Sequence, residues 1–436
     1  MSLRKPSLSF SQIVNMNVGF FGIQYSFGLQ QSAVNPIYDF LGASPDEIPL
    51  LNLAGPVTGL LIQPFIGALS DSTWHPKWGR RKPYFFIGAL LCSICLLLYP
   101  FSSSLWMAAS LLWILDAGNN TAMEPYRAFV ADKLNDEQQP TGFQMQSFFT
   151  GFGQTLANLS LFIFPMIFIG KTGSLPTWVY ASFFLGAVCS IGSIWWSMHT
   201  TSEIEPTEEE LKEIRARKTS VLESIFEIFH AIREMPKVMW QLALVYLFQW
   251  YALFCYWQNS SKSIALSVWN ATPKDNPELY EQAVSWTGLV NGWYNIVTFL
   301  SALALARYAN KYGAKTVHMV CLILAAAGFL AFPHIENKNL LFFAISGFGI
   351  GWASMMGIPY LLVVGDIPKE RYGVYMGIIN MMIVIPMILQ NLSFGYILKH
   401  FLDNDPRNAI TFAGALLAIA ALATAFIQPS PSKQSA

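Results

Sequence analysis

Long apolar stretches recur along the whole chain and constrain its fold more than any other feature. A helix needs about 20 mainly apolar residues to cross the hydrocarbon core of a bilayer. Segments such as FFIGALLCSICLLLYPF are apolar on every side, which is typical of a membrane span. We expect twelve spans, at residues 10–38, 48–70, 84–103, 105–131, 142–169, 177–198, 237–261, 283–306, 315–333, 339–364, 373–398 and 408–428.

The composition fits a polytopic membrane protein. Of the 436 residues, 53% are hydrophobic and 12% are charged, whereas soluble proteins carry about 25% charged residues. The formal net charge is zero, so we expect no nucleic-acid partner. We expect the protein to be a monomer in the lipid bilayer. Its other partner should be a small-molecule substrate.

Lysine and arginine predict the orientation. If the N-terminus lies in the cytoplasm, most of the 26 Lys and Arg residues fall in cytoplasmic segments, as the positive-inside rule requires. Both termini are then cytoplasmic. The longest cytoplasmic segment contains amphipathic helical patterns and divides the chain into an N-terminal six-helix half (1–198), a linker (199–236) and a C-terminal six-helix half (237–436).

An internal repeat relates the two halves. At an offset of 234 residues, three separate places align: Glu124-Pro125-Tyr126 with Ile358-Pro359-Tyr360, Gly79 and Arg81 with Gly313 and Lys315, and Gln24 and Ser26 with Gln258 and Ser260. Parallel halves of this kind are the layout of major facilitator transporters, whose substrate site lies between the halves near mid-membrane. The predicted fold is therefore an all-α membrane protein with twelve transmembrane helices, the major facilitator fold and two parallel six-helix halves.

The predicted loop between spans two and three is similar to a loop motif of that superfamily. It contains Asp71, then Gly79, Arg80 and Arg81. We call these residues the cytoplasmic latch and expect them to form charge pairs at the inner helix ends that break as the halves rock. The alternative is a solvated, positive-inside loop without a specific role.

One predicted span contains several ionisable side chains. The stretch WILDAGNNTAMEPYRAF places Asp116, Glu124 and Arg127 inside span four, and we expect no Asp, Glu, Lys or Arg deep in any other span. His318 is expected near a membrane interface. A charge at the bilayer centre costs from about 3 to over 10 kcal/mol, so such residues are usually paired or functional.

Helical geometry gives these residues different roles. Asp116, Asn120 and Arg127 share one face at 3.6 residues per turn. Glu124 and Arg127 are three residues apart and can pair. Desolvation favours the neutral form of a carboxyl group, so Asp116 is the candidate proton-coupling residue. The alternatives are an Asp116 carboxylate that is permanently hydrogen-bonded to Asn119, Asn120 or another helix, and an Arg127 that only extends to the membrane surface.

Amide and aromatic side chains within the spans predict a sugar site. Sugar hydroxyls need both donors and acceptors, and amides supply both. Phosphorylated cargo would need a basic cluster, which the spans lack. The candidate binding or gating residues are Arg127, Glu124, Asn119, Asn120, Gln24, Tyr25, Asn52, Gln258, Asn291 and Tyr360. We predict no metal site and no cofactor, with the proton as coupling ion. Sodium stays open, because Asp116 could supply one charged oxygen ligand.

The spacing Asp116-x-x-Asn119-Asn120-x-x-x-x-Pro125-x-Arg127, with the latch residues, resembles the sucrose–proton symporters within the glycoside–cation symporter branch of the major facilitators. The resemblance implies that Asp116 carries the proton and that Arg127 is required for transport. Glu124 and a short loop between the first two spans depart from the plant pattern. Bacterial relatives also take maltose, so the identity of the disaccharide stays open.

The sequence thus predicts a proton-coupled importer of a disaccharide such as sucrose or maltose, working by alternating access in a bacterial inner membrane or a plasma membrane. The alternatives are a sodium-coupled glycoside symporter and a drug-exporting major facilitator. We do not expect an enzyme, because no His or Cys accompanies Asp116 as a second catalytic group.

Overall fold

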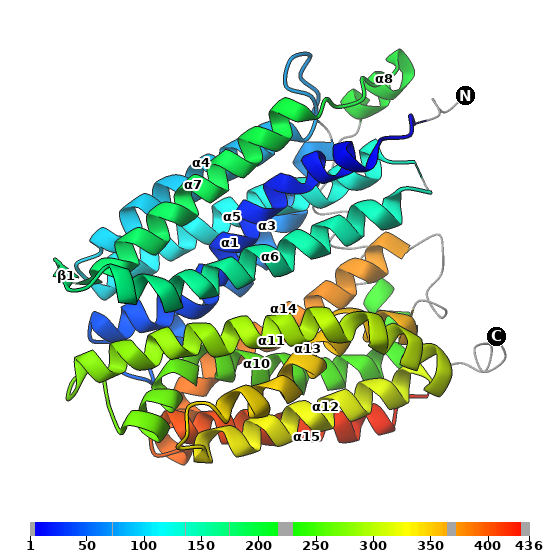
Figure 1. Ribbon diagram of the computed structural model, residues 1–436. Coiled ribbons are helices and arrows are strands. Elements are labelled where there is room, and N and C mark those ends of the chain that lie inside the picture. The colour runs from blue at the N-terminus through cyan, green and yellow to red at the C-terminus, as the bar shows by residue number, and fades with distance from the viewer. Residues whose placement is uncertain are drawn as a thin grey trace. The chain divides into compact units, whose positions relative to one another are not determined.

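The structure, a computed structural model, describes residues 5–71, 73–135, 137–173, 175–216, 230–363 and 372–428, and long helices make up most of it (Figure 1). In the first part of the chain the helices are α1 (Phe10–Phe40), α2 (Ile48–Leu51), α3 (Ala54–Asp71), α4 (Lys82–Leu98), α5 (Leu105–Lys133), α6 (Gln139–Ile167), α7 (Thr177–Thr200) and α8 (Glu208–Ala216). In the second part they are α10 (Lys237–Trp269), α11 (Pro277–Tyr312), α12 (Ala314–Ala331), α13 (Leu341–Val363), α14 (Tyr372–Phe401) and α15 (Pro406–Ala425).

The remaining elements are short. Single 3-10 turns at Tyr99–Phe101 and Phe332–His334 extend α4 and α12. Between α6 and α7, β1 (Lys171–Thr172) pairs antiparallel with β2 (Leu175–Pro176).

Each of the twelve predicted spans coincides with a long helix, the second of them with α2 and α3 together. Among the described residues, eight helical segments are apolar enough to cross a membrane by length and composition alone. The other four predicted spans are α1, α5, α6 and α11, with 31, 29, 29 and 36 residues. These four carry many of the amides and charged groups, which neighbouring helices can cover inside a bundle.

The described chain divides into two compact units, Met1–Leu41 with Val57–Val221, and Gly42–Pro56 with Leu222–Ala436. In the first unit α1 packs against α6 and α7, and α4 packs against α5 and α7. In the second unit α10 packs against α14 and α15, and α12 packs against α13 and α15. The same helix pairs therefore meet in both units, as the 234-residue repeat predicts. The short segment Gly42–Pro56 is the exception, because its helix α2 packs on α14 of the second unit.

Two glycines fix the position of α5, the helix with the ionisable side chains. A Cβ atom at Gly88 of α4 would lie 2.6 Å from the carbonyl oxygen of Gly118. The backbones of α4 and α5 therefore approach so closely that larger side chains cannot fit, as is common between membrane helices. About two turns further along, Tyr126 of α5 donates a hydrogen bond to the carbonyl of Met16 in α1.

Candidate functional site

Asp116 is buried in the middle of α5, with an exposed fraction of 3%. Tyr38, Cys92 and Tyr99 lie close enough to interact electrostatically with it. In the described part of the chain, no hydrogen-bond or ion-pair partner contacts its carboxylate, whereas its main-chain carbonyl accepts a hydrogen bond from the Asn120 side chain. The carboxyl group is therefore withdrawn from solvent and forms no salt bridge with the described residues.

The two neighbouring amides point to different helices. Asn120 links α5 to α3, because its amide nitrogen donates to Thr58 Oγ1 (3.1 Å) and its oxygen accepts from Gln63 (2.6 Å). Asn119 links α5 to α1 and α4, through Ser26 (3.0 Å) and the thiol of Cys92 (3.1 Å). Asn119 is fully buried with both ends of its amide satisfied, so it holds the bundle together. Neither amide side chain holds the Asp116 carboxylate, contrary to the alternative considered from the sequence.

Glu124 and Arg127 do not form the expected pair. Arg127 is exposed and Glu124 is half-buried, and within the described residues neither has an ion-pair partner. The side chain of Glu124 instead points at α3, where its Cγ lies 3.7 Å from the position of a Cβ at Gly67. Pairing at i,i+3 is only a weak preference, and the packing of α3 on α5 decides the direction of Glu124.

The basic residues of the cytoplasmic latch bind carboxylates that lie outside the latch and that the sequence did not single out. Arg81 forms an ion pair with Asp132 of α5, with 2.7 Å between Nε and Oδ2, and also donates to Ser70 Oγ (2.6 Å). Arg80 donates to the carbonyl of Ser70 (3.1 Å). The side chain of Asp71 lies outside the described part of the structure. In this structure the latch therefore joins the ends of α3, α4 and α5.

Glu203, after α7, binds the start of α4. Its carboxylate accepts hydrogen bonds from the backbone N–H groups of Arg80 (2.8 Å), Arg81 (2.9 Å) and Lys82 (2.9 Å). Gly79 has φ +77°, and a Cβ there would lie 2.5 Å from the Glu203 carboxyl carbon. Glycine is thus required both by the left-handed backbone and by the contact. A carboxylate at a helix N-terminus satisfies N–H groups that lack partners within the helix.

The other candidates of the first half lie in helix contacts or near a helix end. Gln24 of α1 accepts a hydrogen bond from Gln154 of α6 (3.0 Å). Tyr25 is buried, and a Cβ at Gly186 of α7 would lie 3.4 Å from its ring. Asn52, expected inside a span, instead caps the end of α2 and donates to the carbonyl of Ile48 (2.9 Å). Its segment belongs to the second unit.

The candidates of the second half cluster around α10. Gln258 donates to Asn391 (2.7 Å) and accepts from Gln390 (2.9 Å), both in α14. This cluster corresponds to the Gln24–Gln154 pair, because the repeat aligns Gln24 with Gln258 and α6 with α14. Asn291 of α11 accepts from Tyr256 of α10 (2.9 Å). Tyr360 is partly exposed on α13, close enough to Tyr246 for an electrostatic interaction.

Three buried ionisable residues were missed or misplaced by the sequence. Lys262 was expected in a loop after residue 261, but α10 continues to Trp269 and buries it to 5% exposure. Asp39 is likewise buried in the last turn of α1, at 6%. His318, expected near a membrane interface, lies near the start of α12 and is fully buried, with Nδ1 2.8 Å from Ser354 Oγ. Span ends are difficult to predict because polar residues near them can lie inside a helix that other helices cover.

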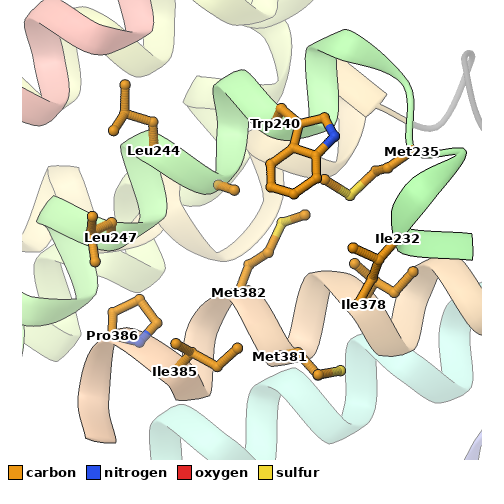
Figure 2. Close-up of a pocket in the computed structure, with 11 residues that line it drawn as sticks. Ile232, Met235, Trp240, Leu244, Leu247, Ile378, Met381, Met382, Ile385 and Pro386 are labelled. Carbon is orange, nitrogen blue, oxygen red and sulfur yellow. The ribbon is translucent and has the colours of Figure 1, made fainter. Parts of the chain in front are cut away.

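A cavity of about 410 Å³ in the second unit is apolar. Figure 2 shows it between the start of α10, including Trp240 and Leu244, and α14, including Met382 and Ile385. Among the described residues, its lining contains no charged or amide side chain. This cavity therefore does not provide the donors and acceptors that a sugar needs.

The sequence and the fold both match known transporters. Residues 16–391 match the Major Facilitator Superfamily. Among curated relatives, the sucrose transport protein SUT2 of Oryza sativa is 25% identical over 93% of this chain and 91% of its own, and the sucrose transport protein SUC4 of Arabidopsis thaliana is 24% identical over 93% and 89%. The predicted resemblance to sucrose transporters is thereby confirmed.

Two solved structures illustrate the likeness of fold. The nucleoside transporter NupG superposes with a TM-score of 0.72, at 13% identity over 96% of this chain and 100% of that one. The xylose transporter XylE from E. coli, in a partially occluded inward-open conformation, gives 0.63, at 14% identity over 95% and 97%. These neighbours are transporters rather than enzymes, and they confirm the predicted fold. The chain is therefore a multi-pass membrane protein that belongs to the Major Facilitator Superfamily.

Proposed function

We propose that this protein imports a disaccharide such as sucrose or maltose together with a proton, with Asp116 as the proton carrier. The observation that carries the proposal is the burial of Asp116 in mid-helix without an ion-pair partner among the described residues. An intramembrane carboxyl group is expensive unless it has a function. The names of the curated relatives support a sugar as cargo.

The proposed cycle is alternating access. Asp116 takes up a proton from outside, the sugar binds between the halves near mid-membrane, and the halves rock so that sugar and proton leave to the cytoplasm. Arg127 acts in binding or gating, and the amides Asn120 and Gln258 supply hydrogen-bonding groups. Both termini face the cytoplasm in this proposal, as the distribution of Lys and Arg favours. We expect a monomer in the cell membrane.

The test is uptake of labelled sucrose and maltose into proteoliposomes, with and without an inward proton gradient. We expect the gradient to drive accumulation in the wild type. Asp116→Asn should abolish accumulation and retain exchange of labelled for unlabelled sugar, because the amide keeps the shape but cannot carry a proton. Asp403→Asn, in an exposed loop, is the matched control and should accumulate sugar normally. Full accumulation in Asp116→Asn, or uptake that follows a sodium gradient instead, would contradict the proposal.

A further inference from the structure

The second unit contains a cluster of three tryptophans at the middle of two helices. Trp352 of α13 lies 5.6 Å from Trp250 and 5.5 Å from Trp257 of α10, between ring centroids, with interplanar angles of 78° and 88°. Trp352 is near the middle of α13, and Trp250 and Trp257 lie on either side of the middle of α10. Substrate sites of this fold lie at the corresponding depth, near the bilayer midplane.

The packing of α13 holds Trp352 in a fixed orientation. A Cβ at Gly347 would lie 2.4 Å from the carbonyl oxygen of Leu324, and one at Gly351 would lie 2.7 Å from Ala325 Cβ. The glycine side of α13 is therefore pressed against α12. Trp352 leaves the helix on another side, where two nearly perpendicular indole rings contact it. A ring that is already ordered loses little conformational freedom when a ligand binds.

One side of this cluster is open. Trp352 and Tyr360 are partly exposed, and Met356, which lies between them at a spacing of four residues, is 45% exposed. These three residues form one stripe along α13. Trp250 is buried at 6%, and its indole N–H has no hydrogen-bond partner in the described part of the chain. Buried tryptophan N–H groups usually find a partner, so an unpaired donor lies directly behind the Trp352 ring.

The cluster has no counterpart in the first half. At the offset of 234 residues, Trp250, Trp257 and Trp352 align with Met16, Ile23 and Gly118. At the same level the first half instead has Asp116 and Asn120. The two halves have thus diverged at mid-membrane, with ionisable and amide groups in one and aromatic rings in the other.

We propose that Trp352, supported by Trp250 and Trp257, forms a stacking platform for a pyranose ring, which makes it a specificity-determining part of the substrate site. This inference rests on the proposed function. The C–H face of the sugar ring packs on the partly exposed indole of Trp352. The platform selects ring-shaped glycosides, whereas the first half provides the proton site.

The experiment compares Trp352→Leu and Trp352→Phe with the wild type in proteoliposomes. The control is Trp240→Leu, which removes a 54% exposed tryptophan from α10, the helix that carries Trp250 and Trp257. We expect the KM for the transported sugar to rise about tenfold in Trp352→Leu, from the size of aromatic stacking energies. Trp352→Phe should show a smaller rise, and Trp240→Leu a KM within about twofold of the wild type.

Tryptophan fluorescence gives a second readout that does not depend on the leucine variant folding. Added sugar should change the emission of the wild type and of Trp240→Leu, and this change should be lost in Trp352→Phe. An unchanged KM in the Trp352 variants, with the sugar-dependent emission retained, would overturn the platform while the proposed function stands. A wild type that transports neither sucrose nor maltose would overturn the proposed function and the platform with it.

Discussion

The contact between Glu203 and the start of α4 allows a quantitative prediction. Glu203→Gln keeps one oxygen as an acceptor but removes the charge and the second oxygen from three N–H···O bonds of 2.8 to 2.9 Å. A hydrogen bond to a charged group contributes about 1.5–3 kcal/mol. The neutral amide can still accept about two weaker bonds, so we expect a net loss of roughly 2–4 kcal/mol. In a domain of 150–250 residues, each kcal/mol lowers Tm by about 2–4 °C.

The assay is thermal unfolding of the purified protein in detergent, followed by intrinsic fluorescence. We expect Tm of Glu203→Gln to fall by about 5–10 °C. Glu205→Gln is the matched control, because Glu205 is an exposed carboxylate two residues further along. It should change Tm by no more than about 1–2 °C. Equal Tm values for the two variants would show that the three hydrogen bonds do not stabilise the latch.

Two further predictions concern charged side chains at other places. Arg127→Lys should lower the rate of sugar uptake at unchanged protein level, because lysine lacks the planar fork of arginine; wild-type uptake by this variant would contradict a binding or gating role. Asp46 pairs with Lys399 at 3.2 Å, and although burial alone would raise the pKa of Asp46, hydrogen bonds from Ser44 and Lys399 lower it overall. The pair should therefore stabilise the protein by less than about 1 kcal/mol at neutral pH. This contribution should disappear as the pH falls below the usual aspartate pKa and then through the lowered pKa of Asp46 in the folded protein. Tm of wild type and Asp46→Asn, measured from neutral to acid pH, checks this, and a difference that grows toward acid pH would contradict it.

The loop motif of the cytoplasmic latch predicted that its basic residues form charge pairs, but it did not identify their partners. The sequence identified Arg81 as part of a charge-paired contact, and the structure pairs it with Asp132. The sequence did not single out Asp132 as the partner of Arg81. Nothing in the sequence marked Glu203, since its contacts are to main-chain N–H groups, which every residue except proline carries.

The candidate site shows the same limit. Helical spacing correctly put Asp116 and Asn120 on one face of α5. It did not distinguish Asn119, which faces α1 and α4, from Asn120, which faces α3. It also favoured a Glu124–Arg127 pair that the structure does not form. Spacing along one helix gives the direction of a side chain, but the neighbour found in that direction depends on how the other helices pack.

The sequence alone determined the number of spans, the repeat of the halves and the one helix with an ionisable stretch near mid-membrane. These features follow from local physics, because each span must separately satisfy the bilayer and each misplaced charge is costly. The tertiary structure decided which helices each amide side chain links and that Glu203 binds the N–H groups at the start of α4. It also decided that three tryptophans from α10 and α13 meet. Some of those contacts join residues that are more than a hundred positions apart in the sequence. Such residues meet only because the helices pack closely against one another.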